Sequence, residues 1–282
     1  MYLAMTIFSK VVGIIPESVL ARMSNALGLF LFDVLRVRRR LMLANIKIAF
    51  PELEAGAAVK MARQSMKHMV MTFMEMIWVC THDMASRMKF SNPEVLIDAL
   101  TRGKGAYILC THTGNFEAFA MILSKNIARV TCPVKRVGSS AGLNRFIFDS
   151  RAKQGMDAFF RGKKGEGSLA IKKALSENRL AGIMIDQARP GEPRISLFGK
   201  PAKTNTSLGA IWEKYPAPII AGYCERIGFA RHIVHLLPEV VFTSTGDLPA
   251  DILVRARTLN SVVEAIVTRC PEQYWWVHDR WK

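Results

Sequence analysis

The order of apolar segments after Gly103 constrains the fold of this chain more than any other feature. Short apolar runs alternate there with stretches of helical spacing, as in 166–177 and 206–215. The runs are 106–110, 129–134, 157–160, 180–185 and 218–224. This alternation predicts an α/β fold with a mixed, mostly parallel sheet flanked by helices. We expect an antiparallel edge strand near 232–237.

The first hundred residues have a different pattern. Apolar residues recur every three or four positions through 57–80, which is typical of an amphipathic helix. The sequence contains no repeat, low-complexity tract or long linker, and 282 residues suffice for one large core. We therefore expect one continuous domain, with a helical part over 1–100 and an α/β part that carries the site over 101–282.

The N-terminal segment 1–32 is apolar but does not predict a spanning helix. Three charged residues interrupt it, namely Lys10, Glu17 and Arg22. A spanning helix needs about 18 or more consecutive apolar residues. The segment 19–35, followed by the basic cluster 36–40, instead predicts a helix that rests in a membrane interface. The alternative is a core helix that ends in a solvated basic turn.

Composition limits the class of partner. Half of the residues are hydrophobic, and 39 Lys and Arg against 23 Asp and Glu give a formal charge of +16. Such a chain attracts anionic phospholipid, nucleic acid or an acidic carrier protein. No zinc-finger, RNP or helix-turn-helix pattern is present in the sequence, so nucleic acid is not an expected partner. The five cysteines are scattered without metal-ligand spacing, so no metal site is expected.

The candidate chemistry follows the predicted strands. Ligands of open α/β sheets bind beyond the carboxyl ends of the strands, where three polar groups stand. These groups are His112 with Glu117, Arg136, and Asp186 with Gln187. An imidazole beside a carboxylate can take a proton from a hydroxyl. The spacing of five residues between His112 and Glu117 is weak evidence for a catalytic pair by itself. A histidine followed five positions later by an acidic residue arises by chance roughly 0.5 times in a chain of this composition.

Five blocks in a fixed order strengthen this interpretation. They are RVRRRLMLANIKIAFPEL, THTGNFE, IDQ, FGKPAKTNTSLG and PEQYWWVHDRWK. Together they closely resemble the lipid A late (secondary) acyltransferases, the lauroyl/myristoyl acyltransferases of lipopolysaccharide biosynthesis. The resemblance covers nearly the whole chain. One departure is Phe116, which stands where the family usually has Trp.

The resemblance implies a function and roles for residues. A fatty acyl chain would pass from an acyl carrier protein or CoA thioester to a lipid A precursor hydroxyl, without an acyl-enzyme or further cofactor. The sheet would be similar to that of glycerolipid acyltransferases. By this match, His112 is the general base and Glu117 orients it. Arg151 in R-x3-G, or Arg136, would stabilise the oxyanion or hold anionic groups, and Asp186 would organise that cation.

Further residues are expected to contact substrate or membrane. The predicted substrate-binding set is Asn115, Arg136, Gln187, Lys163 and Lys164. Both lysines lie in GKKGEG, which is either a plain turn or a contact for a carrier or lipid phosphate. The tryptophans Trp275, Trp276 and Trp281 form either an interfacial belt or ordinary core packing.

The resemblance also implies the cytoplasmic face of the inner membrane as the location. The expected partners are acyl carrier protein, an anionic glycolipid acceptor and the membrane surface. Two alternatives stay open from the sequence. One is an acyltransferase for another membrane lipid, such as an aminolipid or a phosphatidylinositol mannoside. The other is a non-catalytic basic protein that binds membranes.

Overall fold

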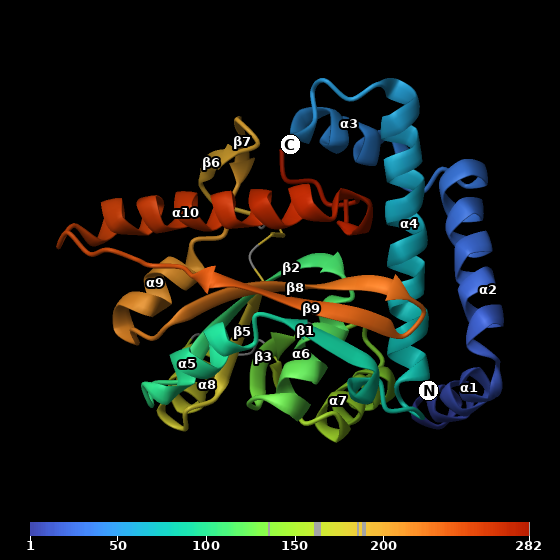
Figure 1. Ribbon diagram of the computed structural model, residues 1–282, viewed down its shortest axis with the longest axis horizontal. Coiled ribbons are helices and arrows are strands. Elements are labelled where there is room, and N and C mark those ends of the chain that lie inside the picture. Colours follow the sequence, from blue (N-terminus) through green and yellow to red (C-terminus); the bar gives the residue numbers. More distant parts are fainter. Residues whose placement is uncertain (135, 161–164, 185, 188–189, 282) are drawn as a thin grey trace.

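The chain folds around a seven-stranded sheet (Figure 1). The computed structural model describes residues 1–282 except 135, 161–164, 185, 188–189 and 282. The strand order is β1-β9-β8-β2-β5-β3-β4. The strands are β1 (Met88–Ser91), β2 (Ala106–Gly114), β3 (Val130–Val134), β4 (Asp157–Phe160), β5 (Leu180–Met184), β8 (Ile219–Gly228) and β9 (Arg231–Glu239).

Most neighbouring strands run parallel, which confirms the predicted mixed, mostly parallel sheet. The antiparallel pair is β8 with β9, and β9 covers the predicted antiparallel segment 232–237. Its predicted edge position is wrong, because β1 pairs in parallel outside it. β1 has only four residues and no apolar run, so the sequence pattern gave no sign of it.

The central strands are apolar throughout because helices cover both faces of the sheet. Along β2, Tyr107 and Leu109 belong to one hydrophobic core, whereas Ala106, Ile108 and Cys110 belong to the other. In Figure 1, α10 lies over one face and α5 and α6 lie over the opposite face. Helix α8 buries Ile171 and Leu175 in the same core as α10. The covering helices are α5 (Glu94–Thr101), α6 (Phe116–Asn126), α7 (Ala141–Lys153), α8 (Glu166–Ser176), α9 (Ser207–Lys214) and α10 (Leu248–Arg269).

A long helix, α4 (Ala55–Trp78), runs along one side of the sheet and confirms the helix predicted over 57–80. A small hairpin of β6 (Arg194–Leu197) and β7 (Lys200–Lys203) lies outside the main sheet. The remaining N-terminal elements are α1 (Tyr2–Ile14), α2 (Glu17–Leu29), a π-helical turn (Phe30–Val34) and α3 (Arg39–Ala49). Short 3-10 turns lie at Ala85–Arg87 and Pro271–Gln273.

Helix α2 packs against α4 along one side only. Gly28 allows this approach, since a Cβ there would lie 2.7 Å from the Lys67 Cα. The other side of α2 and of the following π-helical turn carries an exposed apolar stripe at helical spacing, made by Val19, Met23, Leu27, Phe30 and Val34. No single helix in the described residues is both long and apolar enough to cross a membrane. Helix α1 and the segment 17–34 are long and apolar enough only when taken together, and they are bent by 114° relative to each other.

Candidate active site

Two parallel strands bring His112 and Asp186 together. Strand β2 pairs with β5 in a register that sets Cys110 opposite Met184. Two residues further on, His112 and Asp186 stand at the same edge of the sheet, where the carboxyl ends of parallel strands meet. All nine residues of β2 are buried, so His112 is held on a rigid element and is only 6% exposed.

The Asp186 carboxylate binds His112 twice. Asp186 Oδ1 lies 2.7 Å from His112 Nδ1, and Asp186 Oδ2 accepts the His112 backbone N–H at 2.7 Å. Burial acts to raise the pKa of Asp186, but the His112 imidazole and its hydrogen bonds outweigh burial and hold that pKa below its usual value. An ionised carboxylate at Nδ1 fixes the tautomer in which Nε2 carries the lone pair. The Gln187 amide lies 2.8 Å from Nε2.

The structure therefore corrects the predicted pairing of the carboxylates. Glu117 was expected to orient His112, and Asp186 was expected to organise the arginine. Instead Asp186 binds His112, and Glu117 binds Arg151 through Nε at 3.0 Å and Nη2 at 2.5 Å. The reason is geometric: Glu117 lies in the first turn of α6, within reach of Arg151 on α7, whereas Asp186 follows the strand next to that of His112.

The Glu117–Arg151 pair is a partly buried, two-pronged ion pair. The side chains are 14% and 15% exposed. Burial acts to lower the pKa of Arg151, but the Glu117 carboxylate more than compensates, so the pKa is raised and the guanidinium stays charged. Its Nη1 group takes no part in this pair. Arg136, the other arginine proposed from the sequence, follows β3 and is exposed.

The corner between β2 and α6 depends on two residues. Gly114 has a φ of +62°, and a Cβ there would lie 1.8 Å from the Cys224 carbonyl oxygen, so only glycine fits. Asn115 caps α6, because its Oδ1 accepts the Ala118 N–H at 2.9 Å. Its Nδ2 donates to Glu75 at 2.6 Å. Asn115 is fully buried and caps α6, and the substrate contact expected for it stays a prediction.

Behind this corner lies a buried polar network that sequence reasoning missed. Glu75 of α4 accepts hydrogen bonds from Arg226 Nε at 3.0 Å and Nη2 at 2.9 Å, and His232 Nε2 lies 3.2 Å away. Arg226 Nη2 also donates to Thr72, whose hydroxyl donates to the Gly114 carbonyl. The available signal was an acid on the apolar side of a helix, where Glu75 sits between Met71 and Trp78.

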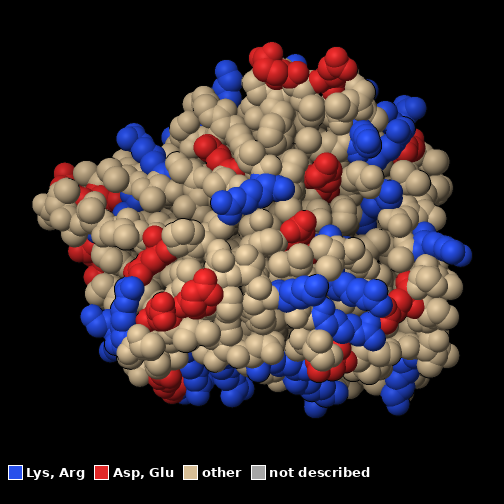
Figure 2. Space-filling view, in the orientation of Figure 1, with Lys and Arg blue, Asp and Glu red and all other residues tan. Residues whose placement is uncertain are grey.

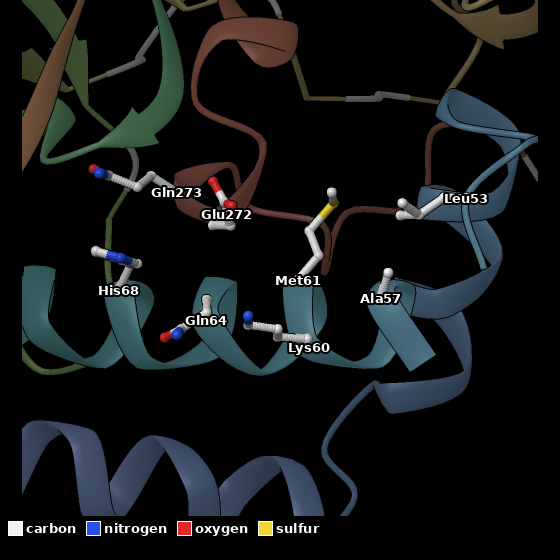
Figure 3. Close-up of a pocket in the computed structure, with 8 residues that line it drawn as sticks. All are labelled: Leu53, Ala57, Lys60, Met61, Gln64, His68, Glu272 and Gln273. Atoms are coloured by element: carbon white, nitrogen blue, oxygen red, sulfur yellow. The ribbon is translucent and has the colours of Figure 1, made fainter. Parts of the chain in front are cut away.

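Within the network, the negative charge of Glu75 is balanced by its direct contact with the Arg226 guanidinium. Burial acts to raise the pKa of Glu75, yet Arg226 and His232 hold it well below its usual value. Burial, with the Arg226 cation, lowers the pKa of His68 to about 3. Figure 3 shows His68 pointing from α4 toward the 3-10 turn Pro271–Gln273, beside a hollow of about 410 Å³. Gln273 of this turn bonds the Arg226 backbone N–H and C=O, which links the C-terminal segment to the network.

The C-terminal segment forms one wall of the site. The Trp275 backbone N–H donates to the His112 carbonyl at 3.0 Å, and Tyr274 forms an isolated antiparallel β-bridge with Thr113. The ring centroids of Phe116, Trp275 and His278 lie 4.6, 5.2 and 6.3 Å from that of His112. Trp276 is buried in the core. These contacts favour packing over an interfacial belt for Trp275 and Trp276.

The remaining predictions concern two lysines, the charged surface and metal binding. Lys163 and Lys164 lie outside the described residues. In Figure 2, Lys and Arg are interspersed with Asp and Glu over the face shown, with uncharged surface between them. In the part of the chain that the structure describes, no group of three or more His, Cys, Asp or Glu side chains is arranged to hold a metal ion.

The arrangement suits acyl transfer to a hydroxyl: an oriented imidazole lies beside aromatic rings, and a charged guanidinium is fixed on the neighbouring helices. The family model for bacterial lipid A biosynthesis acyltransferases matches residues 1–282. The chain belongs to this family. It is an acyltransferase. A comparison with curated proteins gives no match. In this acyltransferase, the blocks THTGNFE and IDQ are the segments that bring His112 and Asp186 together.

Proposed function

We propose that the enzyme transfers a fatty acyl chain from an acyl carrier protein or CoA thioester to a hydroxyl of a lipid A precursor, with His112 as general base. The observation that carries this proposal is the His112–Asp186 pair. Asp186 occupies Nδ1, so Nε2 offers its lone pair on the side where Gln187 lies. The acceptor hydroxyl takes the place of the Gln187 amide at Nε2.

The step needs no protein nucleophile. The acceptor oxygen attacks the thioester carbonyl carbon while its proton moves to His112 Nε2. The tetrahedral oxyanion then collapses, the carbon–sulfur bond breaks, and the leaving thiolate takes the proton from the imidazolium. Asp186 stabilises the imidazolium during this exchange. Arg151, held by Glu117, is the cation that would stabilise the oxyanion.

The proposed location is the cytoplasmic face of the inner membrane. The exposed stripe on α2 and the π-helical turn is 39–64% exposed residue by residue and faces away from α4. Such a face suits the boundary between headgroups and acyl chains. The glycolipid acceptor and the acyl carrier protein are both anionic, and both would be attracted to a chain of charge +16.

The test is His112→Ala, assayed with a panel of acyl carrier protein thioesters and a tetraacylated Kdo-lipid A precursor. Loss of the base should lower kcat by about 10²-fold or more, with mass spectrometry of the acceptor as the readout. Circular dichroism and vesicle association should match the unchanged protein. Near-normal turnover of the variant would refute the assigned mechanism. Acylation of a different membrane lipid by the unchanged protein would change the acceptor and keep the chemistry.

A further inference from the structure

The basic cluster 36–40 lines a hollow near the candidate active site. A hollow of about 990 Å³ is lined by arginines, apolar side chains and one acid from the C-terminal segment. The lining residues are Arg36, Arg38, Arg39, Arg40, Leu41, Leu43, Ala44 and Asp279. Its volume lies in the range of small-molecule clefts, about 300–1,000 Å³. The hollow is therefore large enough for a sugar headgroup.

The hollow adjoins the active site through residues 277–279. Arg38 Nη1 donates to the Val277 carbonyl at 3.4 Å, and Asn45 donates to the His278 carbonyl at 2.7 Å. The His278 ring lies 6.3 Å from that of His112, and Asp279 lines the hollow. Residues 277–279 therefore contact both the hollow and the surroundings of His112. In Figure 1, α3 and the C-terminal end of the chain lie side by side.

Only part of the positive charge in this turn is used by the fold. Arg39 lies 3.6 Å from Asp33 and over the Phe32 ring. In contrast, Arg36 and Arg40 are exposed, and neither has an ion pair with any residue that the structure describes. Arg36 and Arg38 also adopt φ angles of +53° and +50°, a conformation that costs about 1 kcal/mol or more per non-glycine residue. The fold maintains unneutralised charge in a strained turn.

The surroundings indicate an amphipathic ligand. Leu41, Leu43 and Ala44 form part of the wall. Next to the arginines, Val34 is the last residue of the apolar stripe and is 64% exposed. Leu35 and Val37, which are 55% and 38% exposed, extend this apolar surface. Guanidinium groups pair with phosphate through two parallel hydrogen bonds, and the apolar side chains suit acyl chains. A purely protein partner would use the charge but not the adjoining lipid-like surface.

We infer that this hollow binds a phosphate on the sugar of the glycolipid acceptor, with Arg36 and Arg40 as its ligands. The inference rests on the proposed function and deepens it: the phosphate is held in the hollow while a hydroxyl of the same molecule reaches His112. Arg38 shapes the wall by its bond to Val277. Arg39 fixes the turn through Asp33. The site makes the enzyme selective for phosphorylated glycolipids over neutral ones.

The experiment compares Arg36→Gln/Arg40→Gln with a control that removes the same charge elsewhere. Lys172→Gln/Arg257→Gln is that control, since both residues are exposed on α8 and α10. Each protein is assayed with the tetraacylated acceptor and with the same acceptor after phosphatase treatment. The KM for the phosphorylated acceptor should rise about 10- to 100-fold in the first variant only. Its kcat, and its KM for the dephosphorylated acceptor, should stay unchanged.

A binding measurement separates this inference from the proposed function. Both acceptors in neutral detergent micelles are titrated against each protein without an acyl donor. Phosphate-dependent binding that the first variant loses supports the site, even if no transfer is found. Equal binding of the phosphorylated acceptor by the two variants overturns the inferred site and leaves the proposed acyl transfer unaffected. A defect confined to anionic phospholipid vesicles, or to the KM of the acyl carrier protein thioester, also overturns it and makes the turn a membrane or carrier contact.

Discussion

At the scale of single residues, the chemistry depends on which carboxylate meets which cation. Asp186 contacts His112 at two atoms, and Glu117 contacts Arg151 at two atoms. Each pair joins segments far apart in the chain, by 74 and 34 residues. The two pairs therefore act as two units, one that moves a proton and one that presents a positive charge.

This division predicts the outcome of a double-mutant cycle. Asp186→Asn should lower kcat by about 10²–10⁴-fold, because a neutral amide does not stabilise the imidazolium. In the His112→Ala background, the same change should cost little more, since the unit is already broken. Glu117→Gln should still lower turnover in that background. If instead Glu117→Gln cost little more in the His112→Ala background while Asp186→Asn still lowered turnover there, the pairing of Glu117 with His112 that the sequence suggested would be restored.

At the scale of elements, the corner from β2 into α6 positions His112 and Glu117 together. Three contacts hold it: Asn115 caps α6, the Thr72 hydroxyl of α4 donates to the Gly114 carbonyl, and the Glu75–Arg226 pair joins α4 to β8. The buried pair is costly to break, because either partner left alone would be an unpaired buried charge. The N-terminal helix α4 is thus part of the support of the site.

Replacing the glycine at this corner should separate the cost of a positive φ from the cost of a steric clash with the Cys224 carbonyl oxygen. Gly114→Ala places a methyl group 1.8 Å from the Cys224 carbonyl oxygen at a φ of +62°. Gly138→Ala is the matched control, because its φ is +58° and nothing lies within 4 Å. The control should lose about 1 kcal/mol in urea unfolding and keep its turnover. Gly114→Ala should lose several times that stability, and its transfer activity. Equal behaviour of the two variants would contradict the role assigned to the corner.

At the scale of the whole molecule, buried ionisable groups make the fold sensitive to acid. The pKa of His68 is lowered to about 3, and that of His232 is also lowered, in both cases first by burial. Between pH 6.5 and about 3, the unfolded chain therefore binds more protons than the folded one, so stability falls as the pH falls. The lowered pKa values of Glu75 and Asp186 add losses below about pH 4.5.

Urea unfolding between pH 7.5 and 4 would measure this effect. The free energy of unfolding should decline below pH 6.5 by at most about 1.4 kcal/mol per pH unit for each histidine. His68→Gln keeps an acceptor for Arg226 and removes one titrating group, so its decline should be shallower. His232 should preserve part of the slope. A variant with an unchanged slope would show that His68 does not titrate in this window.

The sequence by itself determined the α/β class, most strands of the sheet and the segments that carry the chemistry. Those features depend on local apolar patterning and on residues that follow strands, which a linear chain displays directly. Only the tertiary structure decided that Asp186 serves His112, that Glu117 serves Arg151, and that Asn115 joins Glu75 and Arg226 in a buried network. These contacts depend on strand order and register, since parallel strands bring distant residues to one edge and spacing along the chain does not record which residues meet.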